Sequence, residues 1–268
     1  MNVPQLLQDI ATKLTHAEAP RPSGQLSGHA GGLVFEGLAH KELVSHAPGR
    51  AFRHYEALNA ALSDFVATGK KPESATFGEP ALDYLVSRSK SATEKWKPSN
   101  PFEEKQNDTA ESILFSDGEL KFESPEVTLI DIKSQNASKP SQPPNIISAN
   151  KLSQAAKLVL ESGAEPKFDI YYLGVRFFPT ERNGVKILKA DEWCVVDLFK
   201  IAPTELYINW AAALQIQFHP FDVKQNYQRS KRDWFRDFLE HCYSKSLASR
   251  IAKQQKRLDE VLAILHKY

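Results

Sequence analysis

Strand-like and helix-like patterns alternate through the middle of the chain, and this alternation constrains its fold more than any other feature. Four runs are rich in β-branched and aromatic residues, which predicts β-strands. They span 113–115, 127–132, 168–178 and 185–198. A helical pattern at 147–160 lies between the second and third runs, and an apolar stretch at 211–218 could form a last strand.

Helical patterns also lie on both sides of this strand-rich region. They span 2–14, 33–46, 50–67 and 79–87 before it and 230–266 after it, the last as one long helix or two stacked helices. Residues 98–107 are polar and irregular, and residues 20–32 are rich in Gly, Pro and Ser, which predicts a loop. Together the patterns predict an α/β fold of one domain, residues 1–268, with a central mixed β-sheet flanked by helices.

The composition is that of an ordinary water-soluble globular protein. Hydrophobic residues make up 41% and charged residues 25% of the 268 positions. No run approaches the ~18 apolar residues of a membrane span, and the first residues lack the basic and apolar segments of a secretion signal. Cys194 and Cys242 are too few for a disulfide framework. We therefore expect a cytoplasmic protein with two buried free thiols.

One predicted strand ends in a pattern that carries chemistry, the run LIDIK at 129–133. Because side chains alternate along a strand, Asp131 and Lys133 point to one face while the isoleucines point into the core. An earlier acid, Glu111 or Asp108, precedes the predicted strand at 113–115. Two carboxylates can hold Mg²⁺, and a lysine beside the metal can balance charge on a phosphate. The pattern indicates metal-dependent phosphodiester hydrolysis, with a structural ion pair as the alternative.

The charge distribution is uneven although the net charge is only +1. Lysine and arginine occur without any acid in 132–160 and 244–257, and a third basic stretch at 88–97 contains one acid. Such patches fit a DNA-contacting face, and they equally fit solvated helix faces. Charge alone does not decide between these interpretations.

Several motifs, in the same order, resemble those of the HincII-type restriction endonucleases in the PD-(D/E)xK nuclease superfamily. The matching stretches are 27–31 (SGHAG), 87–94 (SRSKSATE), 102–110 (FEEKQNDTA), 129–133 (LIDIK), 144–149 (PNIISA) and 205–213 (ELYINWAAA). The resemblance implies a homodimer that uses Mg²⁺, for which Mn²⁺ can substitute. It also implies cleavage of double-stranded DNA at a palindromic hexamer such as GTYRAC, leaving blunt ends with 5′-phosphates and 3′-hydroxyls. A cognate DNA methyltransferase would be its partner in a restriction-modification system.

The resemblance divides the chain into three parts and assigns the catalytic residues. N-terminal helices with a DNA-contacting loop would occupy 1–98, a catalytic sheet core 99–220 and C-terminal helices 221–268. Carried over position by position, Glu111, Asp131 and the carbonyl of Ile132 would be metal ligands, and Lys133 would lie beside the attacking water. The family has Asp rather than Glu after Thr-Ala, and a shorter chain than the 20 positions here (131 − 111). Asp108 therefore stays the competing first carboxylate.

The resemblance also assigns the DNA contacts. Asn145 and Asn209 would read base edges, because an amide offers a donor and an acceptor together. Gln142 would push into the stacked bases at the central pyrimidine–purine step, which unstacks cheaply. The structural alternatives are a satisfied amide at a helix start for Asn209 and an exposed loop tip for Gln142. Further contacts would come from Ala212, Gln106, Lys90, Arg88 and His29.

Two other functions stay open on the sequence. A monomeric nuclease of the same fold could nick or repair DNA, and its mass in solution would distinguish it from a dimer. A DNA-binding protein with a decayed metal site would fit Glu111 in place of Asp, and it would bind plasmid DNA with Mg²⁺ without cutting it.

Overall fold

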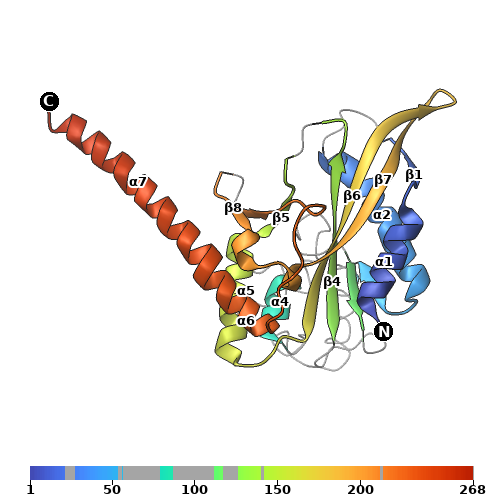
Figure 1. Ribbon diagram of the computed structural model, residues 1–268, viewed down its shortest axis with the longest axis horizontal. Coiled ribbons are helices and arrows are strands. Elements are labelled where there is room, and N and C mark those ends of the chain that lie inside the picture. The colour runs from blue at the N-terminus through green and yellow to red at the C-terminus, as the bar shows by residue number, and fades with distance from the viewer. Residues whose placement is uncertain are drawn as a thin grey trace, which may run out of the picture.

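The computed structural model describes residues 1–21, 28–53, 56, 79–86, 112–116, 126–139, 142–211 and 214–267, with the backbone alone for 28–31. Its centre is a six-stranded mixed sheet with helices on both sides (Figure 1). The strand order is β1 (Glu18–Pro20), β7 (Val185–Asp197), β6 (Phe168–Arg182), β4 (Val127–Asn136), β3 (Ser112–Phe115) and β2 (Ala51–Arg53). The predicted α/β fold with a central mixed sheet is confirmed.

The two central strands, β4 and β6, run parallel over their full ten-residue pairing. Parallel neighbours need a crossover connection, and helix α5 (Ala149–Ser162) lies in it. Ser148 caps the start of α5 by accepting a hydrogen bond from the backbone of Lys151, and Gly163 ends it with φ of 69°. β6 and β7 instead form a long antiparallel hairpin.

Each face of this sheet carries its own hydrophobic core. Ile130 and Ile132 of β4 pack with α1 (Val3–Leu14) and α2 (Gly28–His46), and we name this side the α2 face. Leu129 packs on the opposite side with α4 (Pro80–Val86) and α5, which we name the α5 face. Because side chains alternate, Asp131 and Lys133 belong to the α5 face.

A second, three-stranded antiparallel sheet lies against the core of the α5 face. Its order is β5 (Asn145–Ser148), β9 (Gln215–Gln217) and β8 (Tyr207–Asn209). Ile147, Ile216 and Ile208 are buried opposite one another in the three strands, and Ile146, at a register shift in β5, is buried as well. Apart from Ile146, the other residues of the three strands are polar or exposed, so one face of this sheet is packed and the other faces solvent.

The C-terminal segment is helical from Lys231 to Leu265. It comprises α6 (Lys231–Asp237), the π-helical turn η4 (Phe238–Tyr243) and α7 (Ser244–Leu265). Trp234, Phe235 and Phe238 are fully buried and fix the first part of this segment in the core of the α5 face.

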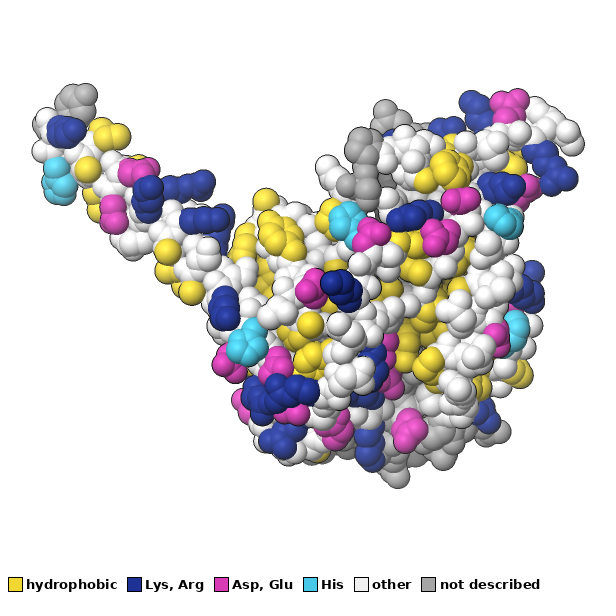
Figure 2. Space-filling view, in the orientation of Figure 1, with side chains coloured by type: hydrophobic (Ala, Val, Ile, Leu, Met, Phe, Trp, Pro, Cys, Tyr) yellow, Lys and Arg dark blue, Asp and Glu magenta, His cyan; other side chains and the backbone are white. Residues whose placement is uncertain are grey.

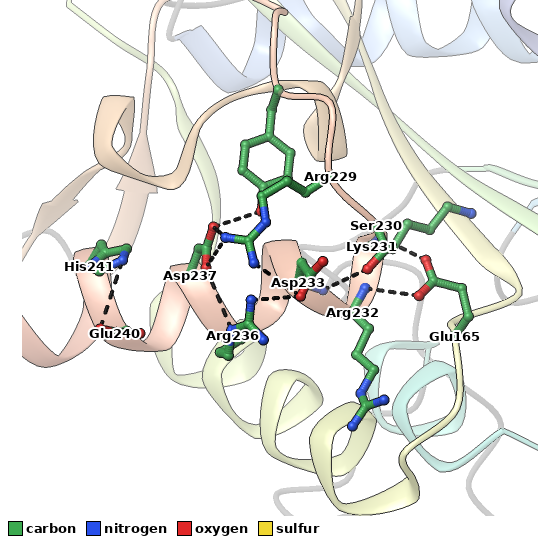
Figure 3. A network of polar contacts seen from close by, with 11 residues as sticks. Glu165, Arg229, Ser230, Lys231, Arg232, Asp233, Arg236, Asp237, Glu240 and His241 are labelled. Carbon is green, nitrogen blue, oxygen red and sulfur yellow. Dashed lines mark hydrogen bonds and ion pairs between the residues drawn. The ribbon is translucent and has the colours of Figure 1, made fainter.

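A network of polar contacts around α6 adds to this anchor (Figure 3). The Glu165 carboxylate, just after α5, accepts hydrogen bonds from the backbone N–H groups of Lys231 and Arg232. At the other end of α6, the Arg229 guanidinium donates two hydrogen bonds to Asp237, at 2.8 and 3.0 Å. Because these carboxylates are engaged by cap and arginine donors, the network positions a helix rather than forming a reaction centre.

Helix α7 projects away from the body of the protein as an arm (Figure 1). None of its residues is buried, yet it carries several apolar side chains that line the arm in Figure 2. None of the helices in the described part of the chain combines the length and apolar character that a membrane span requires.

Three predicted elements are wrong in part. The predicted helix at 50–67 begins instead with strand β2, and positions 54–55 and 57–67 lie outside the described residues. The predicted loop at 20–32 contains the first residues of α2, which begins at Gly28. The single strand expected at 211–218 is shorter, and its partners β5 and β8 were not predicted. The two cysteines are free thiols as expected, Cys242 buried and Cys194 half-buried.

Candidate functional site

Asp131 and Lys133 form an ion pair on the α5 face of β4. Lys133 Nζ lies 2.6 Å from Asp131 Oδ2, and their side chains are 17% and 4% exposed. In the neighbouring strand β6, Asp131 is in register with the fully buried Tyr172. The pair therefore sits in a largely desolvated position at the centre of the sheet, where charges interact more strongly than in water. The predicted same-face arrangement of these two residues is confirmed.

Gly174 of β6, in register with Lys133, lies against the 219–222 segment, which forms a wall beside this pair. A Cβ at Gly174 would lie 2.6 Å from Cys194 Sγ and 2.9 Å from Cβ of Pro220. Only glycine lets the 219–222 segment approach the sheet so closely. Within that segment, the Phe221 ring stacks under the guanidinium of Arg176 at 4.2 Å.

Strand β3 brings its own first residue next to this site. It is antiparallel to β4, and Ser112 is in register with Ile130, the residue before Asp131. The imidazole Nδ1 of His40 in α2 is hydrogen-bonded to Ser112 Oγ at 2.8 Å. Burial, aided by the nearby positive charge of Arg53, lowers the pKa of His40 from 6.5 to about 4, so the ring is neutral at pH 7.

Only some of the proposed metal ligands lie in the described part of the chain. Glu111 and its competitor Asp108 lie outside the described residues. Among the described residues, no group of three or more His, Cys, Asp or Glu side chains gathers in metal-binding geometry. Asp131 and the Ile132 carbonyl supply oxygen donors, the type that Mg²⁺ and Mn²⁺ prefer. With one more carboxylate this donor set fits such an ion.

Two of the predicted base readers, Asn145 and Asn209, are joined through a third amide. Gln217 lies between them on the solvent-facing side of the second sheet. Its Nε2 donates to Asn145 Oδ1 at 2.8 Å, and its Oε1 accepts from Asn209 Nδ2 at 3.2 Å. Asn209 Oδ1 in turn accepts from the backbone N–H of Ala211 at 3.0 Å. We name Asn145, Gln217 and Asn209 the amide row.

The structure describes only some of the remaining residues that were predicted to contact DNA. Gln142 is exposed just before β5. His29 lies in the first turn of α2 rather than in the predicted loop, and its side chain is not among those described. Asn209 is half-buried in strand β8, so the helix start of the structural alternative is wrong. Its amide is hydrogen-bonded within the protein at both Oδ1 and Nδ2, as that alternative expected. Gln106, Lys90, Arg88 and Ala212 lie outside the described residues.

Sequence reasoning missed Gln217 and His40. The pattern Gln215-Ile216-Gln217 in the expected last strand does indicate an outward-facing glutamine. Nothing local indicates the contact of His40 with Ser112, because 72 positions separate them.

Comparison with known proteins identifies the family. The family described as "Restriction endonuclease HincII" matches residues 10–265. The chain is 40% identical over 242 residues to the Type II restriction enzyme HincII of Haemophilus influenzae, covering 88% of both chains. It is 41% identical over 242 residues to the Type II restriction enzyme HindII of Haemophilus influenzae strain Rd, again covering 88% of both. The chain therefore belongs to the HincII family of type II restriction endonucleases, which are site-specific deoxyribonucleases.

Proposed function

We propose that this protein is a Mg²⁺-dependent homodimeric endonuclease that cuts both DNA strands at a palindromic hexamer, with GTYRAC as the first candidate. Mn²⁺ would substitute for Mg²⁺, and the blunt ends would carry 5′-phosphates and 3′-hydroxyls. The observation that carries the proposal is the buried contact of 2.6 Å between Lys133 and Asp131 on the α5 face. A buried ammonium–carboxylate pair in a member of a nuclease family points to phosphate chemistry rather than to surface stabilisation.

In this proposal Glu111, Asp131 and the Ile132 carbonyl hold the metal ion. The pairing of the described residues supports Glu111: Ser112, the first residue of β3, is in register with Ile130. If the same register were continued by one position, Glu111 would lie opposite Asp131. Residues directly opposite in such a pair share a face of the sheet. When bound, the ion polarises a phosphate oxygen and lowers the pKa of water.

Lys133 would stabilise negative charge on the reacting phosphate, and Asp131 would hold the Lys133 ammonium in place. The Lys133 ammonium, held by Asp131 and shielded from solvent, can donate a hydrogen bond to the attacking water or to a non-bridging phosphate oxygen. Water attacks phosphorus in line, the bond from phosphorus to O3′ breaks, and O3′ takes up a proton. The upstream fragment consequently ends in a 3′-hydroxyl, and the downstream fragment begins with a 5′-phosphate.

Recognition would use the solvent-facing side of the second sheet. Asn145 and Asn209 would read base edges, with Ala212 packing nearby and Gln142 wedged at the central step. Gln106 would touch DNA near the catalytic residues, and His29 would contact the minor groove. Lys90 and Arg88 would hold phosphates. The outward direction of the amide row supports the first of these roles.

Helix α7 supports the proposed homodimer. Leu247, Ile251, Leu258, Val261 and Leu265 repeat at intervals of three, four and seven along one side of the helix, the spacing of a coiled-coil seam. The last four are 50–63% exposed, which leaves an apolar stripe uncovered. A second copy of α7 is the occupant that its pattern fits.

The pattern fits an antiparallel arrangement in particular. A two-fold axis at position 256 would set Leu247 opposite Leu265 and Ile251 opposite Val261 of the second copy. The charges agree, because 244–257 is basic without an acid while Asp259 and Glu260 follow it. Antiparallel helices place the acids near the basic half, whereas parallel helices would align the two basic halves.

Digestion of a genome of known sequence with Mg²⁺, followed by sequencing of the ends, tests the proposed function. We expect blunt cuts confined to one palindromic hexamer. Cuts on single strands, or at no defined sequence, would favour a nicking or repair nuclease, and binding without cutting would favour a decayed site. A cytoplasmic enzyme of this kind requires protection of host DNA, so we also propose a cognate methyltransferase as its partner.

A further inference from the structure

The amide row has a fixed direction, and one backbone group determines it. A backbone N–H can only donate, so Asn209 must turn Oδ1 toward Ala211, as observed at 3.0 Å. The Nδ2 group of Asn209 then faces Gln217, whose Oε1 accepts from it. Gln217 therefore directs its Nε2 group toward Asn145 and donates a hydrogen bond to Asn145 Oδ1 at 2.8 Å.

This chain of contacts decides what Asn145 presents to solvent. Its Oδ1 is engaged by Gln217, and in the described part of the chain its Nδ2 group has no hydrogen-bond acceptor. Asn145 is exposed at the start of β5, so its outward group is a donor. An asparagine without such a partner could present either its donor or its acceptor, because the two orientations have the same shape.

We propose that Gln217 is a specificity-determining positioning residue, which turns the Asn145 amide so that a donor faces the DNA. This inference rests on the proposed function, in which Asn145 reads a base edge. The bases that a donor can read in the major groove are those presenting acceptors, N7 or O6 of guanine, N7 of adenine and O4 of thymine. Gln217 itself need not touch DNA for this role.

Two substitutions at Gln217 test the direction of the row. In Gln217→Glu the side chain only accepts, so Asn209 keeps its partner while Asn145 must rotate its amide to donate inward. Asn145 then presents Oδ1, and we expect preference at one base pair of each half-site to move by about tenfold toward adenine N6 or cytosine N4 donors. In Gln217→Met the row is broken, and we expect discrimination at that same base pair to weaken by about the same factor.

Gln215→Glu is the matched control. Gln215 lies two residues away in β9 and is half-buried like Gln217. Among the described residues the hydrogen bond to Asn145 comes from Gln217 and not from Gln215. Its added negative charge should weaken binding to all sequences equally, through the phosphates, without changing the order of base preferences. Asn145→Ala supplies a second control, since in that background Gln217→Glu should no longer shift the preference.

The measurement is relative cleavage and binding across every single-base variant of the wild-type site, with thermal unfolding to check that each variant folds. A shift confined to one base pair per half-site supports the proposal. Unchanged preferences in both Gln217 variants would overturn it, and so would an equal loss at every position. Failure of the proposed function would be seen separately, as a wild-type protein that neither binds nor cuts any defined sequence.

Discussion

At the scale of single residues, the proposed function depends on the Lys133–Asp131 pair. Lys133→Met removes the ammonium with little change of shape, and we expect cleavage to slow by several orders of magnitude while sequence-specific binding largely survives. Asp131→Asn should have a similar effect, because it removes a carboxylate proposed to hold the metal ion. Single-turnover cleavage and DNA-binding measurements check both variants. Lys13→Met is the control, since it breaks a contact of equal length, 2.6 Å to Glu42, on an exposed surface. Full activity of Lys133→Met would refute the site.

Gly174 permits the wall beside this pair to form. Gly174→Ala should destabilise the protein by about 1–3 kcal/mol, because the new Cβ would overlap Cys194 and Pro220 at 2.6 and 2.9 Å. Gly37→Ala should instead stabilise α2 by roughly 0.5–1 kcal/mol, since nothing lies within 4 Å of a Cβ there. Denaturant unfolding measures both changes, and a neutral Gly174→Ala would show that the wall is not closely packed.

His40 makes stability depend on pH. Its folded-state pKa of about 4 lies below the ordinary 6.5. Between these two pH values His40 is therefore protonated in the unfolded chain and neutral in the folded protein. The contribution of the neutral ring is complete above pH 6.5 and is lost as pH falls toward 4. His40→Gln should therefore flatten part of the decline in unfolding free energy between pH 6.5 and 4. Ser112→Ala should lower stability at every pH and keep the decline. An identical decline in His40→Gln would contradict the low pKa.

At the scale of elements, local periodicity predicted the long segments and failed where distant contacts decide. Strands β3, β4, β6 and β7 of the central sheet and helix α5 follow from their own residues, whereas the short edge strand β1 was not predicted. Strand β2 has only three residues and exists through its pairing with β3, so its sequence resembled a helix. Helix α2 begins among glycines that each cost about 1 kcal/mol of helix propensity. Gly32 is explained by packing, since a Cβ there would lie 3.1 Å from Ser134 Oγ of β4.

The candidate site divides in the same way. Asp131 and Lys133 were predictable because their shared face follows from strand alternation. Gln217 was not, because its role depends on two side chains contributed by other strands.

Helix α7 gives a prediction at this scale. The pair Ile251→Lys and Leu258→Lys puts two charges on the apolar stripe, and we expect the proposed dimer to dissociate to the 30.1 kDa monomer. Ala252→Lys with Ala263→Lys adds the same charge elsewhere on the exposed helix and should leave the dimer intact. Sedimentation velocity measures the mass. A stripe variant that stays dimeric but binds DNA more weakly would make α7 a DNA contact instead.

On the scale of the whole molecule, the residues proposed for catalysis and those proposed for base recognition lie on separate sheets. The Lys133–Asp131 pair belongs to the central sheet and the amide row to the second sheet, and both sheets pack on the core of the α5 face. Under the proposed function, changes in the amide row should therefore alter sequence preference while the Lys133–Asp131 pair keeps its packing. The arm α7 lies outside both sheets, which leaves it accessible to a second copy.

The most direct measurement of the proposed chemistry is anomalous diffraction from crystals soaked in Mn²⁺. We predict a peak about 2 Å from a carboxylate oxygen of Asp131 and from a second carboxylate, Glu111. The peak should vanish in Asp131→Asn. A Mn²⁺ ion bound elsewhere, with Asp131 still paired only to Lys133, would contradict the proposed metal site and the mechanism built on it.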